Sequence, residues 1–179
     1  MLMTMLRATL VAGLLAVLAL SGTASAEPYA PVAKDPGKPT IAGQEAGYPL
    51  EQMMLQATAE MVPDRSAVEQ PPYPGAVIVT AQKGGPGSSN DVPFVALPSL
   101  VLHTTDDVAK VVAFYVESLP GWTRYDYFGM DYLYKGSGEF KPMEKSGRET
   151  PNVFVMELPA AMRFHAMPDA KTSITISYK

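Results

Sequence analysis

The chain has 179 residues, no cysteine, 14 basic and 18 acidic side chains, and a formal net charge of −4. This acidic balance argues against nucleic acid as a partner, because proteins that bind nucleic acid normally carry a basic face. Without cysteine the chain forms no disulfide, no thiolate metal site and no thiol nucleophile, so its stability must come from an apolar core.

The first 26 residues follow the pattern of a secretory signal peptide. Arg7 precedes an apolar run of 13 residues, Ala8 to Leu20, and small residues then lead to Ala24-Ser25-Ala26. A membrane-spanning helix needs about 20 apolar residues, so this run is too short to serve as one. We therefore expect cleavage after Ala26, a periplasmic or secreted protein, and no stable membrane anchor on the mature chain.

Residues 27–72 are expected to form a flexible leader that contains one short helix. Prolines recur between residues 27 and 47, where they exclude a regular helix or a central strand. Residues 63–72 are predicted to be a second linker, which leaves 73–179 as a single folded domain. A helix is predicted over 48–62, because apolar side chains recur there at helical spacing: Leu50, Met53, Met54, Ala57 and Met61.

The domain is predicted to begin with two extended segments. Residues 76–82 (AVIVTAQ) are rich in β-formers, and residues 94–104 form a second extended stretch. Pro98 interrupts that second stretch, which indicates a bulge or an edge position. Between the two, residues 83–90 (KGGPGSSN) are predicted to be a flexible loop.

Residues 106–119 are the clearest helix in the sequence. Thr105 is expected to cap its amino end, and Pro120-Gly121 ends it. A single apolar stripe indicates that the helix lies on one face of a sheet. The stripe consists of Val108, Val111, Val112, Tyr115, Val116 and Leu119.

The rest of the chain is predicted to be strands. Residues 122–135 are predicted to form a hairpin that turns at Phe128-Gly129, and 152–158 and 172–178 two further strands. In the last, Thr172 and Ile174 face one way while Ser173 faces the other, an alternation that indicates one buried face and one wet face. The predicted order is β-β-α-β-β-β-β. The predicted fold class is therefore α+β: a mainly antiparallel sheet of about six strands, one principal amphipathic helix on one face, and a shorter N-terminal helix.

Residues 122–135 also hold the densest aromatic cluster. With a two-residue turn the four tyrosines share one face, whereas a three-residue turn divides them between two faces. The first register places Asp126 opposite Asp131, and the repulsion between these like charges destabilises it. The aromatic cross-strand pairs of the same register stabilise it by a comparable amount. We favour this first register. The four tyrosines are Tyr125, Tyr127, Tyr132 and Tyr134.

A shared tyrosine face allows two interpretations. It could bind an apolar or sugar-like ligand or a partner protein, since tyrosine offers apolar area with a polar tip. Alternatively, the helix packs on it and it is part of the core. Asp126 and Asp131 are interpreted as surface carboxylates, because nothing nearby completes a cation site that needs six or more oxygens.

One methionine and histidine pattern gives an alternative function. Met143 precedes His165 with 21 residues between them, and Met167 lies two residues further on. This spacing resembles the later part of the Met-His-Met pattern of periplasmic copper(I) chaperones, which implies copper(I) handling by these three side chains. The earlier ligand of that pattern falls on Tyr132, with Met130 two residues away. That family is an all-β sandwich, whereas this sequence predicts a strong helix.

Enzymatic motifs are absent from the sequence. It has no G-x-S-x-G elbow, no H-E-x-x-H zinc helix and no P-loop, since the glycine cluster at 84–87 lacks the Lys-Ser/Thr that follows in P-loops. The sequence therefore favours a non-enzymatic exported binding domain without a cofactor. A hydrolase of unrecognised type is a further alternative, and it would require a deep polar cleft with perturbed titratable groups.

Overall fold

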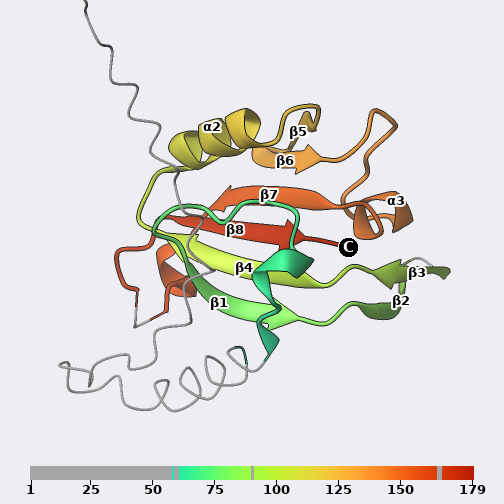
Figure 1. Cartoon of the computed structure of the whole chain (residues 1–179), viewed down its shortest axis with the longest axis horizontal. Helices are drawn as coiled ribbons and strands as arrows, with labels where there is room; N and C mark the ends of the chain where they lie inside the picture. Colours follow the sequence, from blue (N-terminus) through green and yellow to red (C-terminus); the bar gives the residue numbers. More distant parts are fainter. Residues whose placement is uncertain (1–57, 59–60, 90, 165–166) are drawn as a thin grey trace, which may run out of the picture.

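The computed structural model describes residues 58, 61–89, 91–164 and 167–179. Its centre is a six-stranded antiparallel sheet in the order β1-β4-β8-β7-β6-β5, and β2 pairs with β3 in a separate two-stranded sheet (Figure 1). The α+β class with a mainly antiparallel sheet is thus confirmed. The elements are η1 Arg65–Ala67, β1 Val77–Gln82, β2 Gly85–Ser89, β3 Val92–Ala96, β4 Ser99–Thr104, α2 Val108–Ser118, β5 Thr123–Tyr127, β6 Met130–Tyr134, α3 Lys145–Arg148, β7 Asn152–Glu157, η2 Ala160–Met162 and β8 Thr172–Ser177.

Helix α2 covers one face of the sheet over β6 and β7 (Figure 1). Its buried residues form one apolar cluster with Leu133, Val153 and Ile174, so we call this side of the sheet the helix face. Two details differ from expectation. The cap is Asp107 rather than Thr105, and its side chain makes no capping hydrogen bond. Val116 is 50% exposed, because it lies on the side of the helix that faces away from the sheet.

The predicted linker at 63–72 is wrong, because this segment packs on the domain. Val68 is 1% exposed and belongs to the same apolar cluster as α2. The Gln70 Nε2 donates to the Ser177 carbonyl at 2.9 Å. The folded part therefore begins before Tyr73. The predicted signal peptide, residues 27–47 of the predicted leader and the predicted helix at 48–62 lie outside the described residues, except for Thr58, Met61 and Val62 at that helix's end.

The predicted flexible loop at 83–90 is also wrong, because it contains strand β2. Glycine lets β2 and the residue before it approach β3 closely: a Cβ on Gly84 would lie 2.4 Å from the Ala96 carbonyl oxygen, and one on Gly87 would lie 2.7 Å from Phe94 Cζ. Pro98 divides the predicted extended segment into β3 and β4, which belong to different sheets. The glycines of this segment therefore allow close packing of β2 against β3 and do not indicate a flexible loop.

The hairpin adopts the first of the two predicted registers. Tyr127 pairs with Met130, Tyr125 with Tyr132 and Thr123 with Tyr134. Phe128 and Gly129 form the turn with φ of 54° and 78°, which is the backbone of a two-residue type I′ turn. All four tyrosines therefore lie on one side of the sheet, which we call the tyrosine face.

The tyrosine face is the side opposite helix α2. Leu133 alternates with Tyr132 and Tyr134 along β6, and it is Leu133 that joins the cluster under α2. Tyr132 and Tyr134 belong to a second apolar cluster. The interpretation in which this face receives the helix is thus wrong.

Candidate binding site

The inner half of the tyrosine face is covered by the connection between β6 and β7. Tyr132 and Tyr134 are only 9% and 7% exposed. The Phe140 ring stacks on Tyr134 with centroids 4.5 Å apart and planes at 10°, and the Tyr134 hydroxyl donates to the Gly138 carbonyl at 2.8 Å. These two tyrosines are the core of a second apolar cluster and offer little surface to a ligand.

The outer half of the face is accessible. Tyr125 is 38% exposed and Phe128 is 86% exposed, while Tyr127 between them is half-buried. The Tyr125 and Tyr127 rings stack with centroids 6.3 Å apart, and Phe128 meets the Tyr127 ring edge-on at 4.7 Å. We call Tyr125, Tyr127 and Phe128 the aromatic tip. It presents adjoining ring surfaces at the end of the hairpin.

Phe128 occupies a backbone position that suits phenylalanine poorly. Its φ of 54° lies in the left-handed region, which costs a non-glycine residue about 1–2 kcal/mol and which asparagine, aspartate or glycine fill in type I′ turns. Strained residues of this kind cluster at functional sites. From the sequence, Phe128 belongs to the aromatic cluster of the hairpin and to its turn, but not to the predicted ligand-binding residues, which are the four tyrosines. A bulky apolar residue before the turn glycine is the signal that would have singled it out.

On the opposite side of the hairpin, the two aspartates are held by protein groups. Asp126 is paired with Asp131, as the register requires. Asp126 is exposed as predicted, but the prediction of a surface carboxylate is wrong for Asp131, which is only 8% exposed. The Arg124 Nε donates to Asp131 Oδ1 at 2.6 Å, which offsets the like-charge contact, and Asp126 Oδ1 accepts from the Gly129 N–H at 3.3 Å. Within the described residues no cluster of three or more His, Asp or Glu side chains is arranged to hold a metal.

The structure separates two of the three proposed copper ligands. Met143 is 56% exposed beside α3, where its carbonyl accepts from the Ser89 hydroxyl. Met167 packs half-buried against the main apolar cluster, near the start of β8. These places are at opposite ends of the sheet (Figure 1). His165 lies outside the described residues. The methionine pair therefore gives no geometric support to a copper(I) site.

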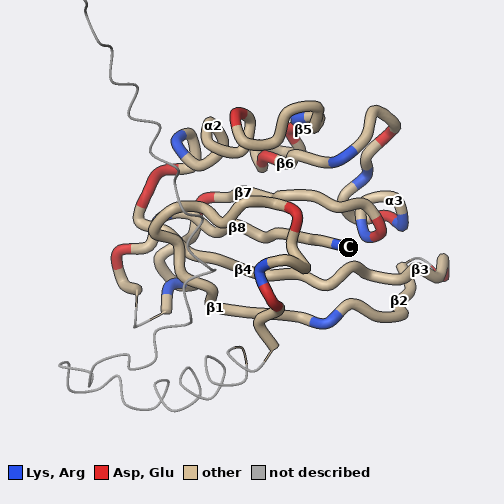
Figure 2. The backbone as a smooth tube through the Cα atoms, in the orientation of Figure 1, with Lys and Arg blue, Asp and Glu red and all other residues tan. Residues whose placement is uncertain are grey.

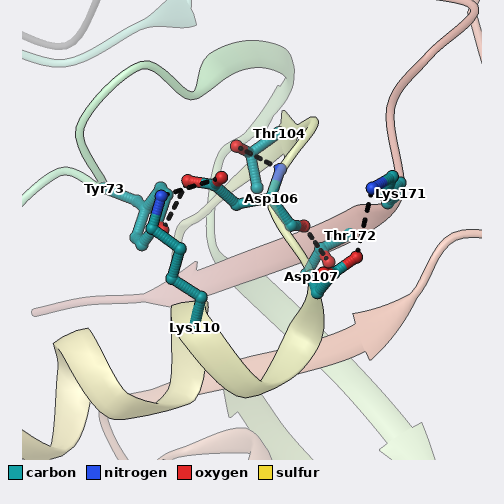
Figure 3. A network of polar contacts seen from close by, with 7 residues as sticks. All are labelled: Tyr73, Thr104, Asp106, Asp107, Lys110, Lys171 and Thr172. Carbon is teal, nitrogen blue, oxygen red and sulfur yellow. Dashed lines mark hydrogen bonds and ion pairs between the residues drawn. The ribbon is translucent and has the colours of Figure 1, made fainter.

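A polar network ties the start of α2 to its neighbours (Figure 3). The Tyr73 hydroxyl and the Lys110 ammonium both donate to the Asp106 carboxylate, at 2.8 and 2.9 Å. The Thr172 hydroxyl donates to the Asp106 carbonyl at 2.6 Å. Burial and the neighbouring Asp106 raise the pKa of Tyr73 to about 12, while the bonds from Lys110 and Tyr73 lower the pKa of Asp106. Each of these polar groups has a partner within the fold. The network therefore joins the segment before β1, the turn after β4, helix α2 and strand β8.

An open groove of about 470 Å³ lies beside this network, between the start of α2, the end of β7 and the start of β8. Its lining carries both signs of charge, and Lys171 pairs with Asp107 at 3.3 Å. His103 does not line it: this residue sits on the tyrosine face, paired with Val77 and Ser173 of the neighbouring strands. The deep cleft with perturbed titratable groups that a hydrolase requires is not formed by these residues.

Charge is concentrated away from the middle of the sheet: β4 and β8 have no charged residue, and β7 has one at its end (Figure 2).

Within the described residues no helix is long and apolar enough to cross a bilayer. Comparison of the chain with protein-family models, with curated proteins and with solved structures gave no match.

Proposed function

We propose that the chain is an exported, non-enzymatic domain that binds a ligand through the aromatic tip. The ligand class that fits is a flat ring with apolar faces and a polar rim, such as the sugar rings of an oligosaccharide. Tyrosine suits such a ligand because its ring offers apolar contact and its hydroxyl hydrogen-bonds at the edge. Export is supported by the signal-like pattern that ends at Ala26.

The exposure of Phe128 carries this proposal. The side chain is 86% exposed on a left-handed backbone, so it gains little burial and adds strain. An asparagine at this position would relieve the strain and remove an exposed apolar surface. A costly aromatic residue next to two stacked tyrosines is the arrangement expected where binding, rather than folding, requires the ring.

The test is a calorimetric titration of the mature protein with chitohexaose, cellohexaose and maltohexaose. We expect at least one of these oligosaccharides to bind, and Tyr125→Ala or Phe128→Asn to weaken that binding at least tenfold, equivalent to about 1.4 kcal/mol. Val116→Ala is the matched control, since it removes an exposed apolar side chain from α2 on the other side of the sheet. N-terminal sequencing of the exported protein should begin at Glu27.

Phe128→Asn separates binding from folding. If Phe128 serves binding, this variant should be more stable than the wild type by about 1 kcal/mol, because the strain of a left-handed phenylalanine is relieved. A loss of stability would instead make Phe128 a packing residue. Failure of all three oligosaccharides to bind would reject a sugar ligand.

A further inference from the structure

We propose that β5 is a self-pairing edge through which two copies of the chain form a dimer. The two β5 strands would run antiparallel across a two-fold axis at Tyr125 and join the two sheets into one. This inference goes beyond the proposed ligand binding and does not depend on it. It follows from the open edge of β5, the direction of its backbone groups and the order of its charges.

The two edges of the main sheet differ. At one edge, β1 has a bulge between Ile78 and Thr80, and the Val79 carbonyl accepts a hydrogen bond from the Thr58 hydroxyl. A bulge and a side-chain partner are common ways to close an edge. At the other edge, β5 is a regular strand, and no described strand pairs with its outer side. An open, regular edge is a template for another strand.

The direction of the backbone groups on β5 follows from its neighbours. The Lys135 N–H, which follows β6, donates to the Pro151 carbonyl on the β7 side at 3.1 Å. Backbone groups alternate in direction along a strand, so those of Tyr134, Tyr132 and Met130 point to β5. The residues paired with them on β5 are Thr123, Tyr125 and Tyr127, and the backbone groups of these residues point back to β6. The N–H and C=O groups of Arg124 and Asp126 therefore point outward, where a second strand could bond to them.

Only one register of a symmetric pair satisfies both bonding and charge. Across the two copies, hydrogen-bonded pairs can involve only residues 124 and 126, because only their backbone groups point outward. Arg124 opposite Arg124, or Asp126 opposite Asp126, would place like charges directly across the ladder, which is destabilising. Arg124 opposite Asp126 of the second copy forms two opposite-charge pairs and aligns the full strand. Tyr125 then meets its own copy on the axis, as an isologous interface requires.

This register also gives partners to side chains that the single chain leaves exposed. Arg124 is 57% exposed while bound to Asp131, and in the dimer it would lie between Asp131 and Asp126 of the second copy. Tyr125, now 38% exposed, would lie beside its own copy on the tyrosine face, so the two rings would adjoin while their outer surfaces stay open to a ligand. Charges on an edge can instead repel other strands. Here, however, the charges alternate in sign and match themselves in the one allowed register, which favours pairing.

The test is sedimentation equilibrium over about 1 µM to about 1 mM protein. Pairing of two five-residue strands buries less area than the roughly 1,600 Å² of a standard interface. We therefore expect a dissociation constant in the micromolar range or above, which these concentrations cover. Arg124→Asp gives two negative charges on the edge, and Asp126→Arg gives two positive charges. We expect the wild type to dimerise and each single variant to be monomeric. Lys83→Asp, a charge reversal beyond the opposite edge, is the matched control and should dimerise like the wild type.

Two further samples make the register falsifiable. An equimolar mixture of the two single variants should form a heterodimer, since the two aspartates on the edge of one chain then meet the two arginines on the edge of the other. The double variant Arg124→Asp/Asp126→Arg should dimerise again. If Arg124→Asp fails to fold, Asp126→Arg and the double variant alone decide, the first monomeric and the second dimeric. A wild type that is monomeric throughout, or single variants that dimerise unchanged, would overturn the proposal.

Discussion

His103 is a titratable side chain buried on the tyrosine face of the sheet. It is 4% exposed, the Phe164 ring packs on it at 5.6 Å, and its Nδ1 has no hydrogen-bond partner among the described residues. Burial lowers the pKa of His103 from 6.5 to about 4. The imidazole is therefore neutral in the folded protein at neutral pH.

This lowered pKa makes stability depend on pH. Between pH 6.5 and 4 the unfolded chain binds a proton at His103 that the folded chain does not, so stability is full above pH 6.5 and falls as the pH is lowered towards 4. The shift from 6.5 to about 4 corresponds to roughly 3 kcal/mol at the low end of this range. Urea unfolding at pH 7, 5.5 and 4.5 would measure the loss.

The control for the histidine is His103→Leu. Leucine keeps the apolar contact with Phe164 and removes the titrating group, and Nδ1 has no described partner to lose. The variant should lose much less stability between pH 7 and 4.5 than the wild type does. Equal losses in both proteins would assign the pH dependence to other groups.

Among the elements, those with a strong periodic pattern were predictable from sequence, whereas β2 was not. Helix α2 begins and ends within two residues of its predicted bounds, because its stripe must face the sheet. Strand β2 (GPGSS) has no apolar alternation, and its existence depends on pairing with β3, a tertiary effect that local propensity cannot reveal. The same limit applies to the tyrosines. Their common face follows from the register, but the cover over Tyr134 comes from Phe140, which lies in a segment without a pattern.

The β2–β3 pair allows a matched glycine test. A Cβ on Gly84 would lie 2.4 Å from the Ala96 carbonyl oxygen and 2.8 Å from the Pro98 nitrogen, both backbone atoms, whereas a Cβ on Gly85 meets nothing within 4 Å. Gly84→Ala should therefore cost about 1–3 kcal/mol of unfolding free energy. Gly85→Ala should change it by no more than about 0.5 kcal/mol. Similar effects of both substitutions would show that β2 tolerates displacement from β3.

At the scale of the whole molecule, the sheet, α2 and the segment before β1 share one apolar core. Val68, Tyr73 and Tyr115 are buried in the same cluster. The sequence predicts a linker at 63–72, because composition reports only the local preference of the backbone. It does not report whether a single valine finds a pocket in a fold formed by residues far along the chain. Since Lys135 also pairs with Glu69 at 2.7 Å, this segment contacts the sheet at several points.

Val68→Ala measures whether that segment belongs to the folding unit. Val68 is 1% exposed, so losing two methyl groups and leaving a cavity should cost about 2 kcal/mol. Ser66→Ala, two residues away and exposed, should change stability by less than about 0.5 kcal/mol. Urea unfolding of both variants should give the same slope as the wild type, because the segment unfolds together with the sheet. A Val68→Ala protein as stable as Ser66→Ala would mean that the segment separates from the domain before the sheet unfolds, and the folded unit would then begin at Tyr73.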